Sequence, residues 1–373
     1  MCIAINTLSL YKTKAGMGRY IVELANRVPK NDLENHYILY VSKQNKNYFD
    51  VDVKNVTIKE VAGIFAFPFL KILWEQLFLP FSLIKNKVDL YHATGFVLPF
   101  WKPKKITYIV TIADMTFFTH PQYHTWIKTV YFRVFIPPSL KKADAVLAIS
   151  ESTKKDIIAI TKTDQEKIIT TYLGVDSYFV PQKKYQDVLK KYNIQQPYIL
   201  FVGMLEPRKN IVGLLKAFSL VSDKKDHTLV IVGKKGWMYA EIFDLVKTLH
   251  LERYVLFTGY VSDEDLPAFY SGATCFVYPS FYEGFGIPII EAMACGCPVI
   301  TSNNSSLQEI AGEAAVLIDP KNVMQIAEAM QNLLKNKKEQ KKRKNAGLRQ
   351  AKRYKWELFA NQMRETYINI LKQ

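Results

Sequence analysis

Two carboxylates and two cations stand out as residues whose types and spacing could do chemistry. Glu283 and Glu291 lie eight positions apart and enclose the short segment 284–287. Arg208 and Lys209 form an adjacent pair earlier in the chain. Arginine binds a diphosphate through a fork of N–H groups and lysine binds it as a point charge. Carboxylates accept hydrogen bonds from hydroxyls, so the set suits a ligand with both a diphosphate and sugar hydroxyls.

The sequence around the carboxylates predicts a short strand, a glycine-containing loop and a short helix. The apolar run 275–278 is strand-like, and Gly284 and Gly286 allow the loop backbone to approach a ligand. Pro288 suits the first helical turn, and Gly296 ends the helix. Unpaired N–H groups at a helix start favour an anion. The pattern also fits a solvated strand–loop–helix unit with ordinary surface glutamates.

Length and charge bound the class of protein. A chain of 373 residues can form two domains, each with its own core. The net charge of +16 calls for an anionic partner, either nucleic acid, an anionic membrane surface or small anionic ligands. Nucleic acid is the weakest of these, because no zinc finger, RNA-recognition signature or basic–aromatic repeat is present. Excess lysine on solvated faces explains most of the charge equally well.

The sequence also predicts where the protein is found. It contains no uncharged apolar run of 18 residues, so we expect no transmembrane helix. The first residues have no basic segment before their apolar ones, so we read them as a first strand and not as a signal peptide. Cys2, Cys275, Cys295 and Cys297 have neither zinc nor obvious disulfide spacing, which is typical of a cytoplasmic protein.

Short β-branched runs alternate with helical segments through both halves of the chain. This pattern predicts two doubly wound α/β domains with parallel sheets. We place the first domain at 1–180 and the second at 181–355, with a final helix over 356–373. The charged segment 179–194 reads as the linker between them. The expected strands are 1–6, 37–42, 88–92, 106–112, 145–150 and 170–173, then 198–202, 228–232, 255–258, 275–278, 299–302 and 315–318.

Three glycine-containing turns follow expected strands or precede expected helices. Gly16 and Gly18 form a G-x-G before a helix over 20–28, but the third glycine of a dinucleotide fingerprint is missing. A nicotinamide dehydrogenase is therefore disfavoured. In the second half, Gly203 and Gly233 follow strands at the edge where α/β sheets bind ligands.

Two segments have a structural and a lipid-binding interpretation. Residues 61–84 are unusually aromatic, and 69–78 read as a helix. A core helix is the favoured interpretation, and an interfacial patch that touches lipid is the alternative. Residues 335–355 are dense in lysine and arginine. They fit a solvated helix face better than a lipid contact.

The motifs resemble those of the retaining, nucleotide-sugar-dependent glycosyltransferases of family 4, which have the GT-B fold. The sequences of these motifs are similar to those of bacterial enzymes that build O-antigen, capsule or exopolysaccharide, many of them mannosyl- or rhamnosyltransferases. The resemblance is carried by Glu206-Pro207-Arg208-Lys209-Asn210, the E-x7-E motif from Glu283 to Glu291, Gly16-Met17-Gly18-Arg19-Tyr20, Leu173-Gly174-Val175-Asp176 (leucine replaces the asparagine of N-G-V-D) and Ser305-Ser306-Leu307-Gln308-Glu309.

The resemblance implies a fold and a role for each domain. In the GT-B fold two Rossmann-like domains face each other across a cleft, and the C-terminal helix returns to the N-terminal domain. The N-terminal domain then binds the acceptor and the C-terminal domain binds the nucleotide sugar. The sequence itself shows neither retention of configuration nor a carboxylate placed as a covalent nucleophile.

The resemblance also implies residue roles in the second domain. Arg208 and Lys209 would hold the diphosphate and assist its departure. Glu283 would bind hydroxyls of the transferred sugar, and Glu291 those of the ribose. The backbone N–H groups of Gly284, Phe285, Gly286 and Ile287 would bind sugar and phosphate, and the base would lie near Gly233 and Tyr260.

One departure from the family pattern affects the first domain. The family often has His-Asp where this chain has Ala113-Asp114. That histidine usually lies near the donor sugar, so the acceptor side and the sugar are less defined. His92 or His120 could replace it, although a lone histidine is more often structural.

The expected activity is transfer of a sugar from a nucleotide sugar to a saccharide acceptor with retention. GDP-mannose is the favoured donor by resemblance and UDP-sugars are second. We expect no metal and no cofactor, because the cations and the helix N-terminus can neutralise the diphosphate and no Asp-x-Asp follows a strand. A polyprenyl-diphosphate-linked acceptor would place the protein in the cytoplasm, at the inner face of the plasma membrane. A sugar-nucleotide epimerase, a phosphorylase and a non-catalytic nucleotide-sugar-binding protein are the alternatives.

Overall fold

The computed structural model describes residues 1–10, 16–50, 53–62 and 68–372. The chain forms two compact units. Unit 1 comprises Met1–Gly174 and Trp356–Gln373, and unit 2 comprises Val175–Lys355. The first boundary, expected after residue 180, therefore falls after Gly174, because the start of the expected linker packs with unit 2.

Unit 1 is a three-layer α/β structure. In its described residues a seven-stranded, wholly parallel sheet has the order β3-β2-β1-β4-β5-β6-β7. Its elements are β1 Cys2–Asn6, α1 Met17–Asn31, β2 His36–Ser42, β3 Val56–Val61, α2 Pro68–Leu77, α3 Leu79–Lys85, β4 Leu90–Ala93, β5 Thr107–Ile112, α4 Thr116–Thr119, α5 Trp126–Lys142, β6 Ala145–Ala148, α6 Glu151–Thr161, β7 Ile168–Thr170 and α15 Trp356–Leu371.

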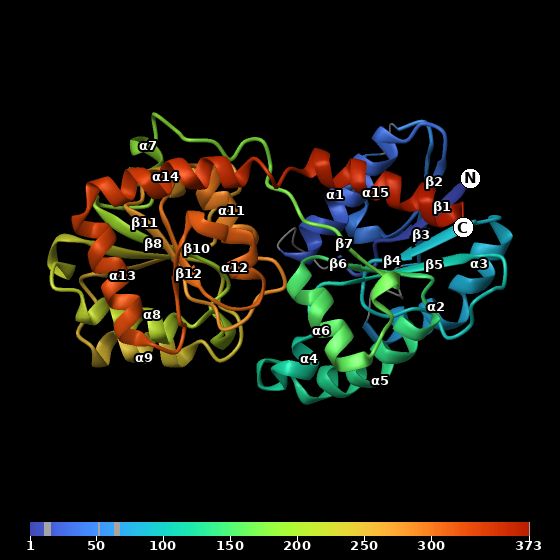
Figure 1. The fold of residues 1–373 in the computed structure, drawn as a ribbon, viewed down its shortest axis with the longest axis horizontal. Coiled ribbons are helices and arrows are strands. Elements are labelled where there is room, and N and C mark those ends of the chain that lie inside the picture. The colour runs from blue at the N-terminus through green and yellow to red at the C-terminus, as the bar shows by residue number, and fades with distance from the viewer. Residues whose placement is uncertain (11–15, 51–52, 63–67, 373) are drawn as a thin grey trace. The chain divides into compact units, whose positions relative to one another are not determined.

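Alternation along the strands of unit 1 divides its core into two faces. Tyr91 of β4 joins a cluster that includes Leu83 of α3 and Ile136 of α5. The next residue, His92, points to the other face, where it meets Tyr20 of α1 and Tyr367 of α15. Figure 1 shows α1 and α15 on one side of this sheet and α2 and α5 on the other. Because successive side chains of a strand point to opposite faces of the sheet, each strand gives an apolar surface to both helix layers.

The C-terminal helix packs on α1, as the expected GT-B architecture requires. Trp356 and Tyr367 are fully buried, and the Phe359 ring packs edge-on against Tyr20 with centroids 5.7 Å apart. The ion pair from Arg27 to Glu357 adds a polar contact of 2.7 Å. The last helix of the sequence is therefore part of the first unit.

Unit 2 has the same architecture. In its described residues a six-stranded parallel sheet has the order β10-β9-β8-β11-β12-β13. Its elements are α7 Gln186–Lys191, β8 Tyr198–Val202, α8 Ile211–Leu220, β9 Thr228–Val232, α9 Ala240–Thr248, β10 Val255–Gly259, α10 Leu266–Gly272, β11 Cys275–Tyr278, α11 Ile287–Ala294, β12 Val299–Ser302, α12 Ser305–Ala311, β13 Val316–Ile318, α13 Val323–Lys335 and α14 Lys337–Ala351.

The strand order of unit 2 explains where a site can form. Strand β8 lies beside both β9 and β11, so the connections leave this centre in opposite directions. The two loops that follow β8 and β11 diverge and open a crevice at the carboxyl edge. Arg208 and Lys209 follow β8, and Glu283 follows β11. The topology therefore gathers residues that are 74 positions apart in the chain.

Several expected elements need correction. The strand expected at 170–173 is β7, which ends at Thr170, and β3 was missed because Lys59 and Glu60 obscure its apolar alternation. The helix expected from residue 20 begins at Met17, so Gly18 lies in its first turn. The basic segment 335–355 contains α14, which packs Gly347 against Met293 of α11. The lysines of α14 are largely exposed, as expected for a solvated helix face, and the helix has one packed face in addition.

None of the helices in the described ranges has the length and apolar composition needed to cross a membrane.

Replacing Trp356 by alanine tests the docking of the C-terminal helix. We expect Trp356→Ala to destabilise unit 1 by about 3–5 kcal/mol, because it leaves a large cavity under α15. Hydrogen exchange with mass spectrometry should show faster exchange of α1 peptides. The matched change Leu358→Ala, at a side chain that is 52% exposed, should alter stability by less than about 0.5 kcal/mol. Equal effects of the two variants would contradict this packing.

Candidate functional site

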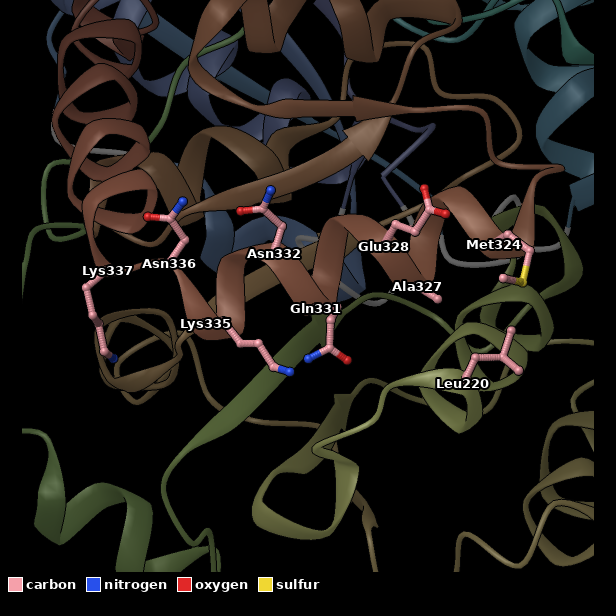
Figure 2. A pocket seen from close by; sticks show the side chains of 9 residues that line it. All are labelled: Leu220, Met324, Ala327, Glu328, Gln331, Asn332, Lys335, Asn336 and Lys337. Carbon is pink, nitrogen blue, oxygen red and sulfur yellow. The ribbon is translucent and has the colours of Figure 1, made fainter.

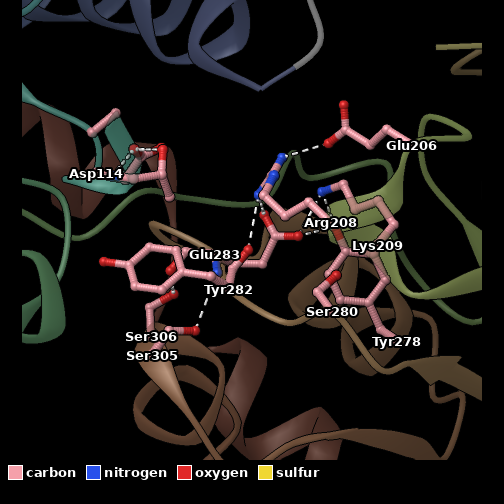
Figure 3. A network of polar contacts seen from close by, with 12 residues as sticks. Asp114, Glu206, Arg208, Lys209, Tyr278, Ser280, Tyr282, Glu283, Ser305 and Ser306 are labelled. Carbon is pink, nitrogen blue, oxygen red and sulfur yellow. Dashed lines mark hydrogen bonds and ion pairs between the residues drawn. The ribbon is translucent and has the colours of Figure 1, made fainter. Parts of the chain in front are cut away.

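Glu283 is the centre of the candidate site in unit 2. Its Oε2 accepts a hydrogen bond of 2.7 Å from Arg208 Nη1, and its Oε1 accepts one of 2.6 Å from Lys209 Nζ. Glu283 and Lys209 are 7% and 8% exposed. Figure 3 shows both cations reaching toward this carboxylate. The structure thus brings together the three residues that the sequence nominated as catalytic, but as an ion-paired cluster and not as separate ligand contacts.

Tyrosine and backbone groups fix this cluster. The Tyr278 hydroxyl donates to Glu283 Oε1 at 3.1 Å and accepts from Lys209 Nζ at 2.6 Å. Arg208 Nη1 also donates to the Tyr282 carbonyl at 2.9 Å, and the Phe281 N–H donates to the Arg208 carbonyl at the same distance. These bonds join the loop after β8 to the loop after β11. The cluster is therefore rigidly positioned by the sheet.

Two members of the cluster were not nominated from the sequence. Glu206 accepts from Arg208 Nη2 at 2.9 Å, and Tyr278 is the last residue of β11. The sequence did place Glu206 in the motif with Arg208 and Lys209, which was a usable signal for a second carboxylate. Tyr278 gave no such signal, because its apolar neighbours made it indistinguishable from a core residue.

The electrostatics of the cluster favour an ionised Glu283. Burial alone would raise the pKa of Glu283, but Arg208 and Lys209 outweigh it and lower the pKa to about 2. Burial, followed by the charge of Arg208, lowers the pKa of Lys209, while Glu283 and Glu206 act in the opposite direction. Glu283 is therefore a permanent acceptor at neutral pH and does not serve as a general acid.

The glycine loop after Glu283 has a backbone that requires glycine. Gly286 precedes α11 with φ of 99°, and a Cβ there would lie 2.7 Å from Leu307 Cδ2. The Ser305 hydroxyl accepts from the Glu283 N–H at 3.1 Å, and the Ser306 hydroxyl donates to the Glu283 carbonyl at 2.9 Å. These two bonds tie the start of α12 to the backbone of Glu283.

Other nominated residues of this loop and helix are largely buried. The Phe285 side chain is 3% exposed and packs edge-on against Tyr354, so its backbone is the part that a ligand could contact. Gly284 lies between Glu283 and this buried ring. Glu291 lies on α11 and is 4% exposed, and its Oε2 accepts from the Tyr270 hydroxyl at 2.9 Å. Tyr270 was not nominated, and it fixes the orientation of Glu291.

Gly203, Gly233 and Tyr260 lie at the carboxyl ends of β8, β9 and β10. The Gly203 N–H donates to the Val232 carbonyl at 2.9 Å. A Cβ on Gly233 would lie 1.8 Å from the Gly203 carbonyl oxygen, so the two turns are in close contact. Tyr260 is 60% exposed, and Lys234 Nζ lies 4.4 Å from its ring centroid. An exposed aromatic face at this edge is a stacking surface.

The nominated glycines of unit 1 lie at the start of α1. Gly16 is exposed and has φ of 56°, and Gly18 is buried in the first helical turn. Ala15, the first residue of the expected loop, lies outside the described residues.

His92, one of two histidines weighed as a replacement for the family residue, lies in the core of unit 1. Ala113 is buried after β5. His92 is fully buried; its Nε2 lies 2.7 Å from Thr111 Oγ1 and its Nδ1 lies 2.6 Å from the Tyr367 hydroxyl. Burial lowers the pKa of His92 to about 3, so the ring is neutral and structural. The interpretation of a lone histidine as structural is confirmed here.

His124 is linked to Asp114 through Thr116, and His120 lies on the turn between them. Asp114 accepts from the Thr116 hydroxyl, and that hydroxyl lies 2.7 Å from His124 Nε2. His120 is half-buried and stacks on Tyr123, with its Nδ1 2.9 Å from Thr119 Oγ1. His124 was not nominated, because it lies ten positions beyond Asp114 and only the turn into α4 brings it back.

A groove of about 730 Å³ lies elsewhere in unit 2, between the end of α8 and α13 (Figure 2). Leu220, Gln331 and Lys335 line it, and it contains none of the nominated residues. Nowhere in the described part of the chain do three or more His, Cys, Asp or Glu side chains gather as metal ligands could.

Comparisons with known proteins identify the family. Residues 15–178 match the model described as Glycosyltransferase Family 4, and 182–350 match Glycosyl transferases group 1. The chain is 37% identical over 291 residues to O-antigen chain mannosyltransferase B of Escherichia coli. The aligned residues make up 77% of this chain and 76% of that protein. It belongs to glycosyltransferase family 4. This confirms the resemblance inferred from the motifs.

Two further relatives extend the match. O-antigen chain mannosyltransferase RfbU of Salmonella typhimurium is 29% identical over 88% of this chain and 90% of its own. The solved sucrose-phosphate synthase from Thermosynechococcus elongatus covers 100% of this chain and 99% of its own, with a TM-score of 0.78 and 21% identity. The second likeness shows the GT-B fold. The chain is therefore a retaining glycosyltransferase with that fold.

The pKa of Glu283 predicts a specific pH dependence of stability. Its folded-state pKa of about 2 lies below the ordinary 4.5, so its contribution is fully present above about pH 4.5 and is lost as pH falls toward 2. The full shift corresponds to about 3 kcal/mol. The stability difference between the parent chain and Glu283→Gln should be constant from pH 6 to 8 and shrink by about 2 kcal/mol at pH 3.

Urea unfolding at each pH measures this difference. Glu252→Gln, which removes an exposed carboxylate, controls for the loss of a charge alone. A difference that changes between pH 6 and 8 would mean that burial, and not Arg208 and Lys209, dominates the titration of Glu283.

Proposed function

We propose that this family 4 enzyme transfers mannose from GDP-mannose to a saccharide acceptor in the synthesis of a bacterial surface polysaccharide. The acceptor is linked to polyprenyl diphosphate, and the enzyme acts in the cytoplasm at the inner face of the plasma membrane. Unit 2 binds the nucleotide sugar and unit 1 binds the acceptor. A UDP-sugar is the alternative donor.

The observation that carries this proposal is the ion-paired cluster of Glu283, Arg208 and Lys209. Its cations suit a diphosphate and its carboxylate suits a sugar hydroxyl. Both cations donate hydrogen bonds to this carboxylate, so the two kinds of group lie side by side. A site that bound a nucleotide alone would gain nothing from a buried carboxylate beside its phosphate-binding cations. A site that binds a sugar diphosphate uses both.

The chemistry follows from the charge that develops on the leaving group. As the bond from the sugar to the diphosphate breaks, negative charge grows on the departing oxygen. Arg208 and Lys209 stabilise this charge because their positions are already fixed by Glu283 and Tyr278 and need little reorganisation. One preorganised donor of this kind typically contributes about 3 kcal/mol to transition-state stabilisation.

The remaining nominated residues complete the donor site. Glu291 accepts from ribose hydroxyls, and the base rests on Tyr260 near Gly203 and Gly233. The backbone of Gly284, Phe285, Gly286 and Ile287 at the start of α11 binds sugar and phosphate, where the helix dipole favours negative charge. That Gly16 and Gly18 of unit 1 also bind this ligand stays a prediction from the sequence. This donor set requires no metal.

The names of the relatives support mannose as the transferred sugar. Both curated relatives described above are called O-antigen chain mannosyltransferases. The match to the first covers most of both chains. A mannosyl donor in bacteria would carry GDP, so the base pocket should prefer guanine. Family membership favours a transferase over an epimerase, a phosphorylase or a non-catalytic binding protein.

A panel of nucleotides tests the donor. Because a ligand that binds only the folded state adds RT ln(1 + [L]/Kd) to the free energy of unfolding, GDP and GDP-mannose at about 100 times their dissociation constants should raise stability by about 2.7 kcal/mol. UDP and UDP-glucose at the same concentration should give a much smaller shift. A large shift with UDP and none with GDP would overturn GDP-mannose in favour of a UDP-sugar.

Replacing Glu283 by glutamine tests the chemical role of the cluster. We expect kcat for transfer to fall by about 10²–10³-fold, a loss typical for one group that stabilises a transition state. GDP binding should be retained or strengthened, because Arg208 and Lys209 lose their internal counter-charge. Radiolabelled transfer and calorimetric titration of GDP give the two values, with Glu252→Gln as the control. An unchanged kcat would remove Glu283 from the site.

A further inference from the structure

A row of large apolar side chains is exposed along α2 and α3 of unit 1. Phe69, Leu73 and Leu77 recur every four residues on α2 and are 75%, 38% and 53% exposed. Phe81 and Ile84 continue the row on α3, with exposed fractions of 63% and 47%. Residues at this spacing share one face of a helix. The two helices therefore present a continuous apolar face to solvent.

The opposite faces of these helices form the core. Trp74 of α2 packs against Tyr40 with ring centroids 5.5 Å apart, and Leu79 and Leu83 of α3 are fully buried. The core interpretation of segment 61–84 is therefore correct for one side of the helices and incomplete for the other. Residues 63–67 of that segment lie outside the described residues.

Helix α5 carries a second exposed apolar row. Trp126, Ile127, Val130 and Val134 are 77%, 73%, 42% and 55% exposed, while Ile136 on the same helix is fully buried. Both rows lie on helices that cover the same side of the sheet (Figure 1). Isolated exposed apolar residues are ordinary, but two parallel rows on one side are not.

The loop that contains Phe100 and Trp101 joins the two rows. Trp101 packs on Phe81 with centroids 5.1 Å apart, and Phe100 packs on Phe135 of α5 at 5.4 Å. The Phe100 N–H donates to Gln76 Oε1 of α2 at 2.8 Å. Phe100 and Trp101 are themselves 57% and 46% exposed. The rows and this loop make one surface, which we call the α2–α5 surface.

The charge of these segments is predominantly positive. Residues 68–87, 98–105 and 115–142 contain ten lysines and arginines and one carboxylate, Glu75. That carboxylate faces inward, where it accepts from Asn6 at 2.9 Å. Lys85, Lys105 and Lys128 are exposed beside the apolar rows. Lysine side chains can lie along an apolar surface while their ammonium groups reach its edge.

We propose that the α2–α5 surface docks the enzyme on an anionic lipid bilayer. Aromatic and aliphatic side chains enter the boundary between headgroups and acyl chains, and the surrounding lysines bind lipid phosphates. A protein partner would need complementary carboxylates around an apolar ridge, whereas a bilayer supplies both phosphates and acyl chains without shape matching. The inference rests on the proposed function only in that a lipid-linked acceptor gives docking a purpose.

Vesicle binding tests this proposal with the full chain. The protein should sediment with vesicles of phosphatidylglycerol and phosphatidylcholine at low salt and much less with phosphatidylcholine alone. The double variant Trp126→Ser/Ile127→Ser should bind about tenfold more weakly, because it removes the two most exposed side chains of α5. Lys104→Glu/Lys105→Glu should weaken binding to the anionic vesicles by a similar factor.

The matched control is Leu220→Ser/Met324→Ser. These side chains are also exposed, at 52% and 57%, but they lie at the groove of unit 2 (Figure 2). This variant should bind vesicles like the parent chain. Binding that is absent in the parent chain, or unchanged in the α5 variant, would overturn the proposal. Self-association of the parent chain that the α5 variant abolishes would instead assign the surface to a second copy.

A water-soluble saccharide acceptor separates this proposal from the proposed function. The α5 variant should transfer sugar to a soluble acceptor at the parental rate, because Trp126 and Ile127 are exposed side chains that are not among the residues proposed to bind the donor or the acceptor. Transfer that fails in both proteins while vesicle binding persists would refute the proposed function alone. Normal transfer without vesicle binding would refute the docking surface alone.

Discussion

The candidate site of unit 2 depends on one buried carboxylate that is kept ionised. Removing a charge from water costs several kcal/mol, and an ion pair offsets this cost only when its geometry is good and its remaining atoms are bonded. Glu283 meets that condition with one cation on each oxygen and with Tyr278 as a further donor. The cations come from the loop after β8 and the carboxylate from the loop after β11, so the cluster exists only when both strands are in register.

The same dependence explains how much of the site could be predicted from the sequence. Glu283, Arg208 and Lys209 were found because charged residues after strand-like runs are unusual and their spacing follows a family motif. Their mutual ion pairing could not be found, because it depends on which strands are neighbours, and sequence does not give the strand order. Glu206 was in the motif but had no assigned role, since a carboxylate two positions before an arginine is ordinary in sequence.

In unit 1 the local sequence was a weaker guide to the roles of individual residues, and the reason is different. Parallel strands buried on both faces contain uniformly apolar residues, so the sequence left His92 open as a ligand at a strand end, although it favoured a structural role. The structure shows that its position on β4 points it toward α1 and toward α15, a helix 275 residues later in the chain. The role of a residue there depends on a helix whose position follows from the fold and not from nearby sequence. The exposed rows of α2 and α5 were obscured in the same way, because residues that face solvent and residues that face the core are both apolar.

The charge of the cluster also limits what it does to a donor. Arg208, Lys209, Glu206 and Glu283 together carry no net charge when all are ionised, whereas a nucleoside diphosphate sugar carries two negative charges, one on each phosphate. The cluster therefore cannot attract the donor from a distance, and that attraction must come from the overall charge of +16. Its contribution is local. Lys209 has three N–H donors and uses two for Tyr278 and Glu283 in the described chain, which leaves one for a phosphate oxygen. Cations that are already paired with internal carboxylates should interact weakly with the intact donor and more strongly as negative charge develops on the leaving oxygen. An interaction that is stronger in the transition state than in the bound substrate lowers the barrier to reaction.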